Sequence, residues 1–176
     1  NRNTADRSYL LFTREAGMLY AYARSAREER SRQRYALQDF SLVRVSLVKG
    51  KRSWKVGSIL AKKNYYQKAV DKEARGSVVG VFRLLRRFMS GEEASPELFN
   101  YVISVLEELV DDVPARQFAL LATQVSVLSY LGYVDLNRIP ESVRLTTPQE
   151  SGEKYSDSLA GMVEQLYTKA VSASHL

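Results

Sequence analysis

The sequence has 176 residues, 45% of them hydrophobic and 26% charged, which suits a globular fold of one medium domain or two small ones. It contains no cysteine and a single histidine, His175, so disulfides and thiolate metal sites are excluded and a histidine-based metal site or catalytic triad has almost no ligands. No apolar run approaches the ~20 residues that cross a bilayer.

The net charge of +6 is divided unevenly along the chain. Residues 1–68 hold 16 lysines and arginines against 5 acids, which gives +11, whereas residues 69–176 hold 10 against 15, which gives −5. This division predicts an anionic partner for the first part, and nucleic acid is the commonest one. A membrane surface is the alternative, but a helix lying on a membrane needs an apolar stripe that the most basic run, residues 24–34, lacks.

The first predicted element is a β-hairpin. Residues 9–13 form an apolar, β-prone run, residues 14–17 supply a turn in which Gly17 can adopt a positive φ, and residues 18–23 read as the returning strand.

A run of arginines follows this hairpin. Five of them fall within eleven residues, offset only by Glu28 and Glu29: Arg24, Arg27, Arg30, Arg32 and Arg34. A basic connection mounted on a sheet is a natural place to hold a phosphate backbone. A charge run taken alone is more often a solvated face or loop, so the rest of the chain decides between the two interpretations.

Two further strands are predicted over residues 40–48 and 53–61, joined by a tight basic turn. Four strands within about sixty residues favour a small barrel or meander over βαβ units. An open meander of this size leaves exposed edges, so we expect closure of the barrel or cover by the second half.

The periodicity becomes helical after Lys63. We expect helices over 64–89 (with Gly76 and Gly80 inside), from Ser95-Pro96 to about 110, over 114–131 with Gly132 at the end, and from Ser156 or Asp157 onward. Residues 135–153 read as a polar connection. The pattern therefore predicts an α+β protein, with a β domain over residues 1–63 and a small helical domain over 64–176.

Enzyme chemistry finds little support. Glu107-Glu108 and Asp111-Asp112 are the densest carboxylates and could bind a hard cation, but such pairs are more often the solvated face of a helix. The sequence shows no glycine-rich phosphate loop after a strand and no nucleophile elbow. We expect no catalytic residues, no metal and no cofactor.

Nucleic-acid binding is better supported. A second basic group joins the arginine run: Lys49, Lys51, Arg52 and Lys55. Aromatic residues are interleaved with these cations: Tyr20, Tyr22, Tyr35, Trp54, Tyr65 and Tyr66. Single-stranded nucleic acid needs this combination, because each base stacked on an aromatic ring contributes ~1–3 kcal/mol. Trp54 alternates with Val56, so core packing and stacking both remain open for it.

Several motifs occur in a recognisable order. Asp6-Arg7 and Leu11–Gly17 give D-R…L-F-T-R-E-A-G, Ala23–Arg27 gives A-R-S-A-R, Leu37–Ser41 gives L-Q-D-F-S, and Tyr130–Tyr133 gives Y-L-G-Y. In this order and spacing they resemble RecO, the bacterial recombination-mediator family, over most of the chain.

The resemblance implies an N-terminal OB-fold β-barrel that binds and anneals DNA, followed by a helical domain. It implies partners of four kinds: single-stranded DNA, double-stranded DNA, a RecR-like protein, and an SSB-like protein. The chain would help to load a RecA-type recombinase onto SSB-coated strands. The resemblance implies no membrane or small-molecule substrate, and a bacterial cytoplasmic, nucleoid-associated location. Arg24 and Arg27 match the family's basic loop, while the other cations are added on charge alone.

The sequence departs from the family in two respects. The first strand of the family's barrel would precede Asn1, and the four-cysteine zinc site of many members is absent. Three cations beside the apolar Phe82 and Leu85 are candidates for binding the SSB tail: Arg83, Arg86 and Arg87. They are equally suited to pair with acids of the following helix.

Two other functions remain as alternatives. One is a protein-interaction adaptor whose basic half binds an acidic partner tail, and the other is an RNA-binding OB module.

Overall fold

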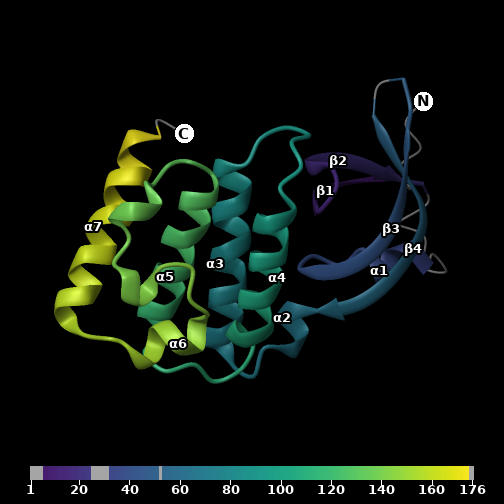
Figure 1. Cartoon of the computed structure of the whole chain (residues 1–176). Coiled ribbons are helices and arrows are strands. Elements are labelled where there is room, and N and C mark those ends of the chain that lie inside the picture. The colour runs from purple at the N-terminus through teal and green to yellow at the C-terminus, as the bar shows by residue number, and fades with distance from the viewer. Residues whose placement is uncertain (1–5, 25–31, 52, 175–176) are drawn as a thin grey trace. The chain divides into compact units, whose positions relative to one another are not determined.

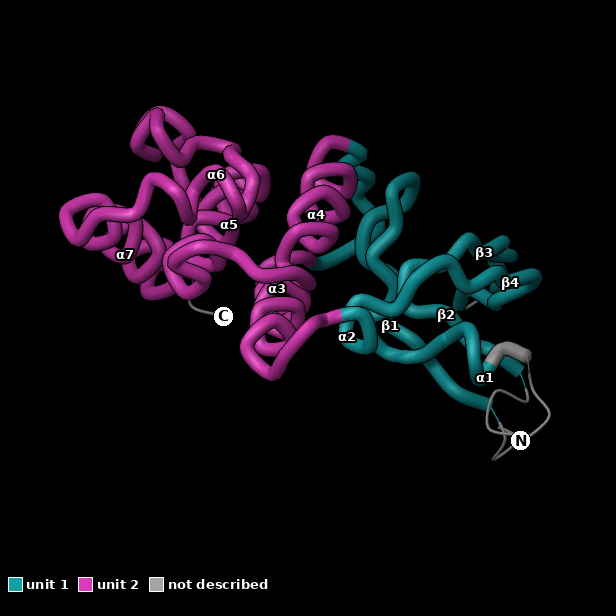
Figure 2. Tube along the Cα trace, turned by 90° about the horizontal axis from the view of Figure 1, so that it is seen from below, with its two compact units in different colours: residues 1–68, 90–96 teal, residues 69–89, 97–176 magenta. Residues whose placement is uncertain are grey.

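A computed structural model of the chain describes residues 6–24, 32–51 and 53–174. The fold is α+β, with strands in the first part and helices in the second (Figure 1). The chain divides into two compact units (Figure 2). Unit 1 comprises residues 1–68 and 90–96, and unit 2 comprises residues 69–89 and 97–176.

Unit 1 is built on a four-stranded mixed sheet, as far as its described residues extend. Its strands are β1 (Arg7–Thr13), β2 (Gly17–Ala23), β3 (Ser41–Lys49) and β4 (Trp54–Asn64), in the order β1-β2-β4-β3. Two short helices, α1 (Arg32–Ala36) and α2 (Tyr65–Lys68), complete the unit. The pairs β1–β2 and β3–β4 are antiparallel, whereas β2 and β4 run parallel over only two residue pairs.

The structure confirms both predicted hairpins and corrects how they join. The sheet is neither a simple meander nor a closed barrel over the described strands, because β4 rather than β3 lies beside β2. The connection from β2 to β3 is long enough to carry the chain past the position that β4 later fills. Short connections force sequential strands to pair, whereas a long one removes that constraint.

One face of the sheet carries the core of unit 1. Tyr9, Ala23 and Leu37 are buried together there, and three half-buried residues pack against them: Leu11, Val56 and Ile59. Tyr9 and Leu11 alternate with residues of the opposite face, as a half-buried strand requires. The other face of the sheet is therefore available for a different role.

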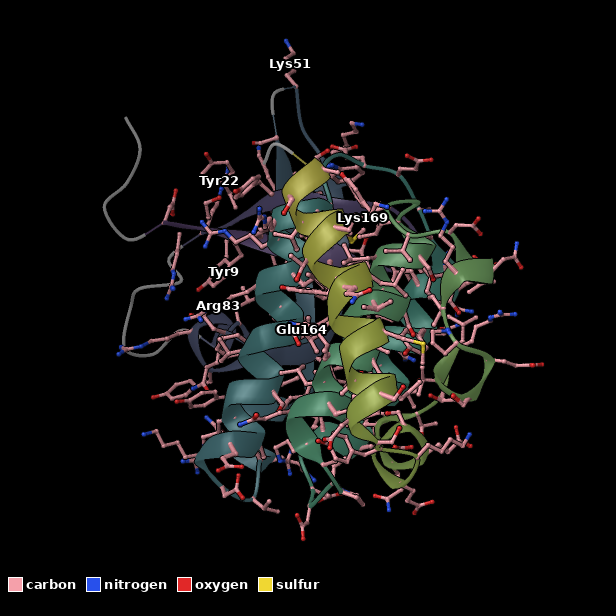
Figure 3. All side chains as sticks on the ribbon, turned by 90° about the vertical axis from the view of Figure 1, so that its left-hand side faces the viewer. Tyr9, Tyr22, Lys51, Arg83, Glu164 and Lys169 are labelled. Atoms are coloured by element: carbon pink, nitrogen blue, oxygen red, sulfur yellow. The ribbon has the colours of Figure 1, made fainter. Side chains whose placement is uncertain are left out.

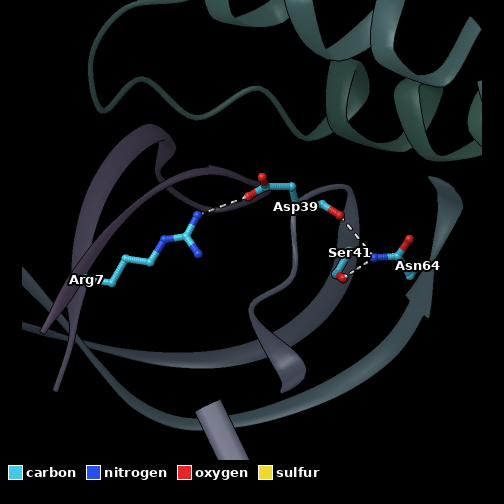
Figure 4. A network of polar contacts seen from close by, with 4 residues as sticks. All are labelled: Arg7, Asp39, Ser41 and Asn64. Carbon is cyan, nitrogen blue, oxygen red and sulfur yellow. Dashed lines mark hydrogen bonds and ion pairs between the residues drawn. The ribbon is translucent and has the colours of Figure 1, made fainter. Parts of the chain in front are cut away.

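A polar network fixes the start of β3 beside the end of β4 (Figure 4). The Asn64 Nδ2 atom donates to Asp39 O at 3.0 Å and to Ser41 Oγ at 2.9 Å, while Asn64 Oδ1 accepts from Gln67 N at 2.9 Å. The Asp39 carboxylate lies 3.9 Å from the Arg7 guanidinium. One amide side chain thus joins the turn before β3 to β4 and to the first turn of α2.

Unit 2 is helical. Its helices are α3 (Lys72–Phe88), α4 (Pro96–Leu109), α5 (Arg116–Tyr130), α6 (Pro148–Glu153) and α7 (Asp157–Ala173), with 3₁₀ turns η1 (Leu136–Arg138) and η2 (Glu141–Val143). Its core contains fully buried leucines and valines such as Leu85, Leu98, Val105 and Leu128. No helix in the described ranges is both long and apolar enough to span a membrane.

Two of the predicted helix starts agree with the structure, those of α4 and α7. Helix α4 begins at Pro96, and α7 follows Ser156, whose side chain accepts from Leu159 N at 3.3 Å. The single helix predicted over 64–89 is instead two, because Asp71 caps a new start by accepting from Ala74 N at 2.7 Å. The predicted connection over 135–153 contains η1, η2 and α6, the last begun by a capping box at Thr147.

Candidate nucleic-acid interface

The outer face of the sheet, opposite the core, presents an aromatic and basic row. Tyr22 of β2 pairs with Lys55 of β4, and Lys55 pairs in turn with Val48 of β3, so these three side chains lie side by side on one face. Lys55 is exposed and Tyr22 half-buried. A ring beside a cation on an accessible sheet is suited to a stacked base and its phosphate.

The same face extends in both directions from this row. Tyr20, two residues before Tyr22, has 60% of its surface exposed and pairs with Leu10 of β1. On the other side, exposed Arg44 of β3 pairs with exposed Leu60 of β4. We call the set Tyr20, Tyr22, Arg44, Val48, Lys55 and Leu60 the outer-face patch.

The β3–β4 hairpin carries cations at its turn as well. Figure 3 shows Lys51 at the far end of the hairpin with its side chain pointing into solvent. Lys49, at the end of β3, pairs in register with Trp54 at the start of β4, and both lie on the face opposite Lys55. The hairpin therefore offers basic side chains on both faces and at its tip.

A carboxylate from a distant segment bridges Lys49 and Trp54. Trp54 Nε1 donates to Glu92 Oε1 at 2.7 Å, and Lys49 Nζ donates to Glu92 Oε2 at 3.2 Å. Lys49 Nζ also lies 5.0 Å from the centre of the Trp54 ring. The hydrogen bonds from Trp54 and then from Lys49 hold the pKa of Glu92 below its ordinary value, because they favour the charged carboxylate.

The predicted arginine run is only partly covered by the structure. Arg24 is exposed directly after β2, and Arg34 is exposed on α1. The backbone of Arg32 lies at the start of α1. Arg27 and Arg30 lie outside the described residues, as does Arg52 of the second basic group. The phosphate-binding roles of all these residues stay predictions.

The three predicted cations of unit 2 lie on α3. Arg83, Arg86 and Arg87 are exposed, and Figure 3 shows Arg83 projecting from the helix. Arg83 and Arg86 form no ion pair with another described residue. The Arg87 guanidinium lies 5.2 Å from the centre of the Phe88 ring, and Phe88 packs edge-to-face on Tyr133 at 4.9 Å.

Sequence reasoning missed Arg44 and Glu92. Arg44 is a lone cation within a strand and belongs to neither basic group, although alternation with Val43 and Val45 places it on the solvent face. Glu92 lies 38 residues from Trp54 and 43 from Lys49, and no local pattern signals such a contact. Within the described ranges, no group of three or more histidines and acids is placed to hold a metal ion.

Comparison with known proteins adds a relationship by sequence, although no family model matches the chain. The chain is 31% identical to the DNA repair protein RecO of Desulforudis audaxviator over 117 residues, 65% of this chain and 47% of that protein. It is 31% identical to the protein of the same name from Myxococcus xanthus over 129 residues, 73% of this chain and 52% of that protein. It is 29% identical to the DNA repair protein RecO of Desulfitobacterium hafniense over 129 residues, which are 73% of this chain and 46% of that protein. The chain spans about half the length of the curated relatives it matches.

Proposed function

Because the chain is RecO-like over the segment that it shares with these relatives, we propose that it is a DNA-binding recombination mediator. In this proposal, unit 1 acts as an OB-type module that binds single- and double-stranded DNA and anneals complementary strands. The chain works without catalysis or a cofactor, with RecR-like and SSB-like proteins, to help load a RecA-type recombinase onto SSB-coated strands. Its place is the bacterial cytoplasm, associated with the nucleoid.

The outer-face patch is the observation that carries the proposal. It combines two tyrosine rings, one exposed and one half-buried, with two exposed cations on neighbouring strands of the sheet, inside a segment whose net charge is +11. Rings stack on bases of any sequence, and cations contact phosphates, so the patch supports binding without sequence preference. We keep residues 1–63 as the proposed OB-fold nucleic-acid-binding domain and 64–176 as the proposed helical domain.

Titration of labelled single-stranded DNA at low and moderate salt tests this function. Lys55→Ala is expected to weaken binding and to reduce the slope of log K against log[salt] by about 1, because one phosphate contact is lost. Tyr20→Ala is expected to weaken binding by ~1–3 kcal/mol with little change in slope, because a stacked base releases no counterion.

Lys72→Ala is the matched control, since Lys72 is an exposed lysine at the start of α3 in unit 2. It is expected to leave binding unchanged. Flat anisotropy for the unaltered protein at low salt contradicts DNA binding, and preferential binding of RNA over DNA of the same sequence favours the RNA-binding alternative. Annealing of complementary strands is then measured with the same variants.

A second function, binding of an acidic-apolar partner tail, is favoured by the surface around Arg87. There the Arg87 guanidinium lies over the ring of buried Phe88, and Phe88 contacts exposed Tyr133, so the accessible ring near the cation is that of Tyr133. Such a surface suits an apolar peptide that ends in a carboxylate. A labelled peptide of that composition is expected to bind, and Arg83→Ala with Arg87→Ala is expected to weaken it; equal binding by the double variant contradicts this assignment.

A further inference from the structure

Glu92 reaches the Lys49–Trp54 pair from outside the strands. It belongs to residues 90–96, which pack on unit 1 although they connect helices α3 and α4. The segment is held by its backbone: Met18 N donates to Gly91 O at 3.1 Å, and a Cβ atom added to Gly17 would lie 2.2 Å from Glu93 O. This close backbone contact fixes where the Glu92 side chain begins.

The contacts that Glu92 makes are those of a bound oxyanion. Its two oxygens accept from two donors on different strands, an ammonium group and an indole N–H. A phosphate group offers the same pair of charged oxygens. The side chains of Lys49 and Glu92 are 67% and 44% exposed, so a polymer can replace the carboxylate without entering the interior.

The neighbouring acid provides a contrast within the same segment. Glu93 is exposed and forms no hydrogen bond or ion pair with another described residue, whereas Glu92 forms two hydrogen bonds. The position of the Glu92 carboxylate is therefore specific and does not follow from general attraction of acids to a basic unit. An exposed ion pair contributes little to stability, so a ligand with several contacts can displace it.

We propose that Lys49 and Trp54 form a contact site for single-stranded DNA, with Lys49 on a phosphate and the Trp54 ring on a base, and that Glu92 occupies this site as a carboxylate substitute when DNA is absent. The inference rests on the proposed function and deepens it. It assigns Trp54, whose role the sequence left open, and it makes Glu92 a residue that weakens DNA binding.

The test uses the intact chain and its single tryptophan, so that fluorescence emission reports on this site alone. A short oligothymidine is titrated, and both anisotropy of the labelled strand and Trp54 emission are recorded. Trp54 emission is expected to change along the binding curve. Glu92→Gln is expected to bind about two- to fivefold more tightly than Glu93→Gln, which removes the same charge one residue away.

Two further variants separate a direct effect from a general one. In a Lys49→Met background, the gain from Glu92→Gln is expected to disappear, because the competing carboxylate then no longer covers a phosphate-binding cation. Trp54→Phe keeps a ring but removes the N–H donor to Glu92, so it is expected to retain stacking and to bind at least as tightly as the unaltered protein. Circular dichroism and thermal melting check that every variant folds.

The outcomes separate a failure of this inference from a failure of the proposed function. If the oligonucleotide binds and Glu92→Gln equals Glu93→Gln, the inference is overturned while DNA binding stands. Emission that changes with an acidic peptide but not with the oligonucleotide also overturns it. If no variant binds the oligonucleotide at low salt, the proposed function and the inference fail together.

Discussion

Gly17 occupies a backbone position that other residue types cannot take without moving a neighbour. Its φ is 62°, in the left-handed region, and an added Cβ would lie 2.2 Å from Glu93 O. Gly91 has a φ of 86°, so it too lies in the left-handed region. Nothing lies within 4 Å of a Cβ added to Gly91, so it has no close neighbour to displace. A comparison of the two positions therefore separates the energetic cost of backbone strain from the cost of close packing.

Gly17→Ala is expected to destabilise the protein more than Gly91→Ala. The Gly91 variant bears only the left-handed backbone cost, about 1–2 kcal/mol, whereas the Gly17 variant must also displace residues 90–96, a further ~1–3 kcal/mol. Urea unfolding followed by Trp54 emission measures both. Equal losses contradict the close contact between Gly17 and Glu93.

Glu92 also predicts a pH dependence. Its pKa lies below the ordinary value of 4.5, because Trp54 and Lys49 hydrogen-bond to the charged carboxylate. The stabilising contact is therefore fully present when the pH is above 4.5. It is lost as the pH falls through the lower pKa that Glu92 has in the folded protein. Trp54 emission is expected to change with a midpoint below pH 4.5, and Glu92→Gln is expected to abolish this change; an unaltered transition in the variant contradicts the contact.

Among the elements, the C-terminal end of α4 is capped by a side chain of the following helix. Arg116, a buried residue of α5, donates from Nη1 to Leu109 O at 2.9 Å and from Nη2 to Asp111 O. The last carbonyls of a helix have no partner within the helix, and a cation there also interacts favourably with the helix dipole. One side chain thus ends α4 and ties it to the start of α5.

Arg116→Met is expected to lower the free energy of unfolding by about 1–3 kcal/mol, because the buried carbonyl group of Leu109 loses its donor. Arg138→Met is the control, since Arg138 is exposed on η1, and it is expected to change stability by less than about 0.5 kcal/mol. Thermal or urea unfolding followed by far-ultraviolet circular dichroism compares them. A small loss in both variants contradicts the capping role.

For the whole molecule, the net charge differs less between the two units than between residues 1–68 and 69–176 of the sequence. The two glutamates of residues 90–96 reduce unit 1 from +11 to +9 and leave −3 for unit 2. Residues 90–96 thus add two acidic side chains to the basic unit, and one of them, Glu92, accepts a hydrogen bond from Lys49 of that unit. In the proposed function, an anionic polymer meets unit 1 while unit 2 repels it, so binding and partner recognition are separated by charge.

Local chemistry in the sequence was enough to predict most elements of this protein. Alternation located the strands, a glycine with positive φ located the first hairpin turn, and Ser-Pro and Ser-Asp pairs located the starts of α4 and α7, because these signals depend on neighbours a few residues apart. The order β1-β2-β4-β3, the outer-face patch and the Glu92 contact with Lys49 and Trp54 were decided only by the tertiary structure. They join residues up to 43 positions apart, and such contacts depend on how strands pair and segments pack, which no short stretch of sequence specifies.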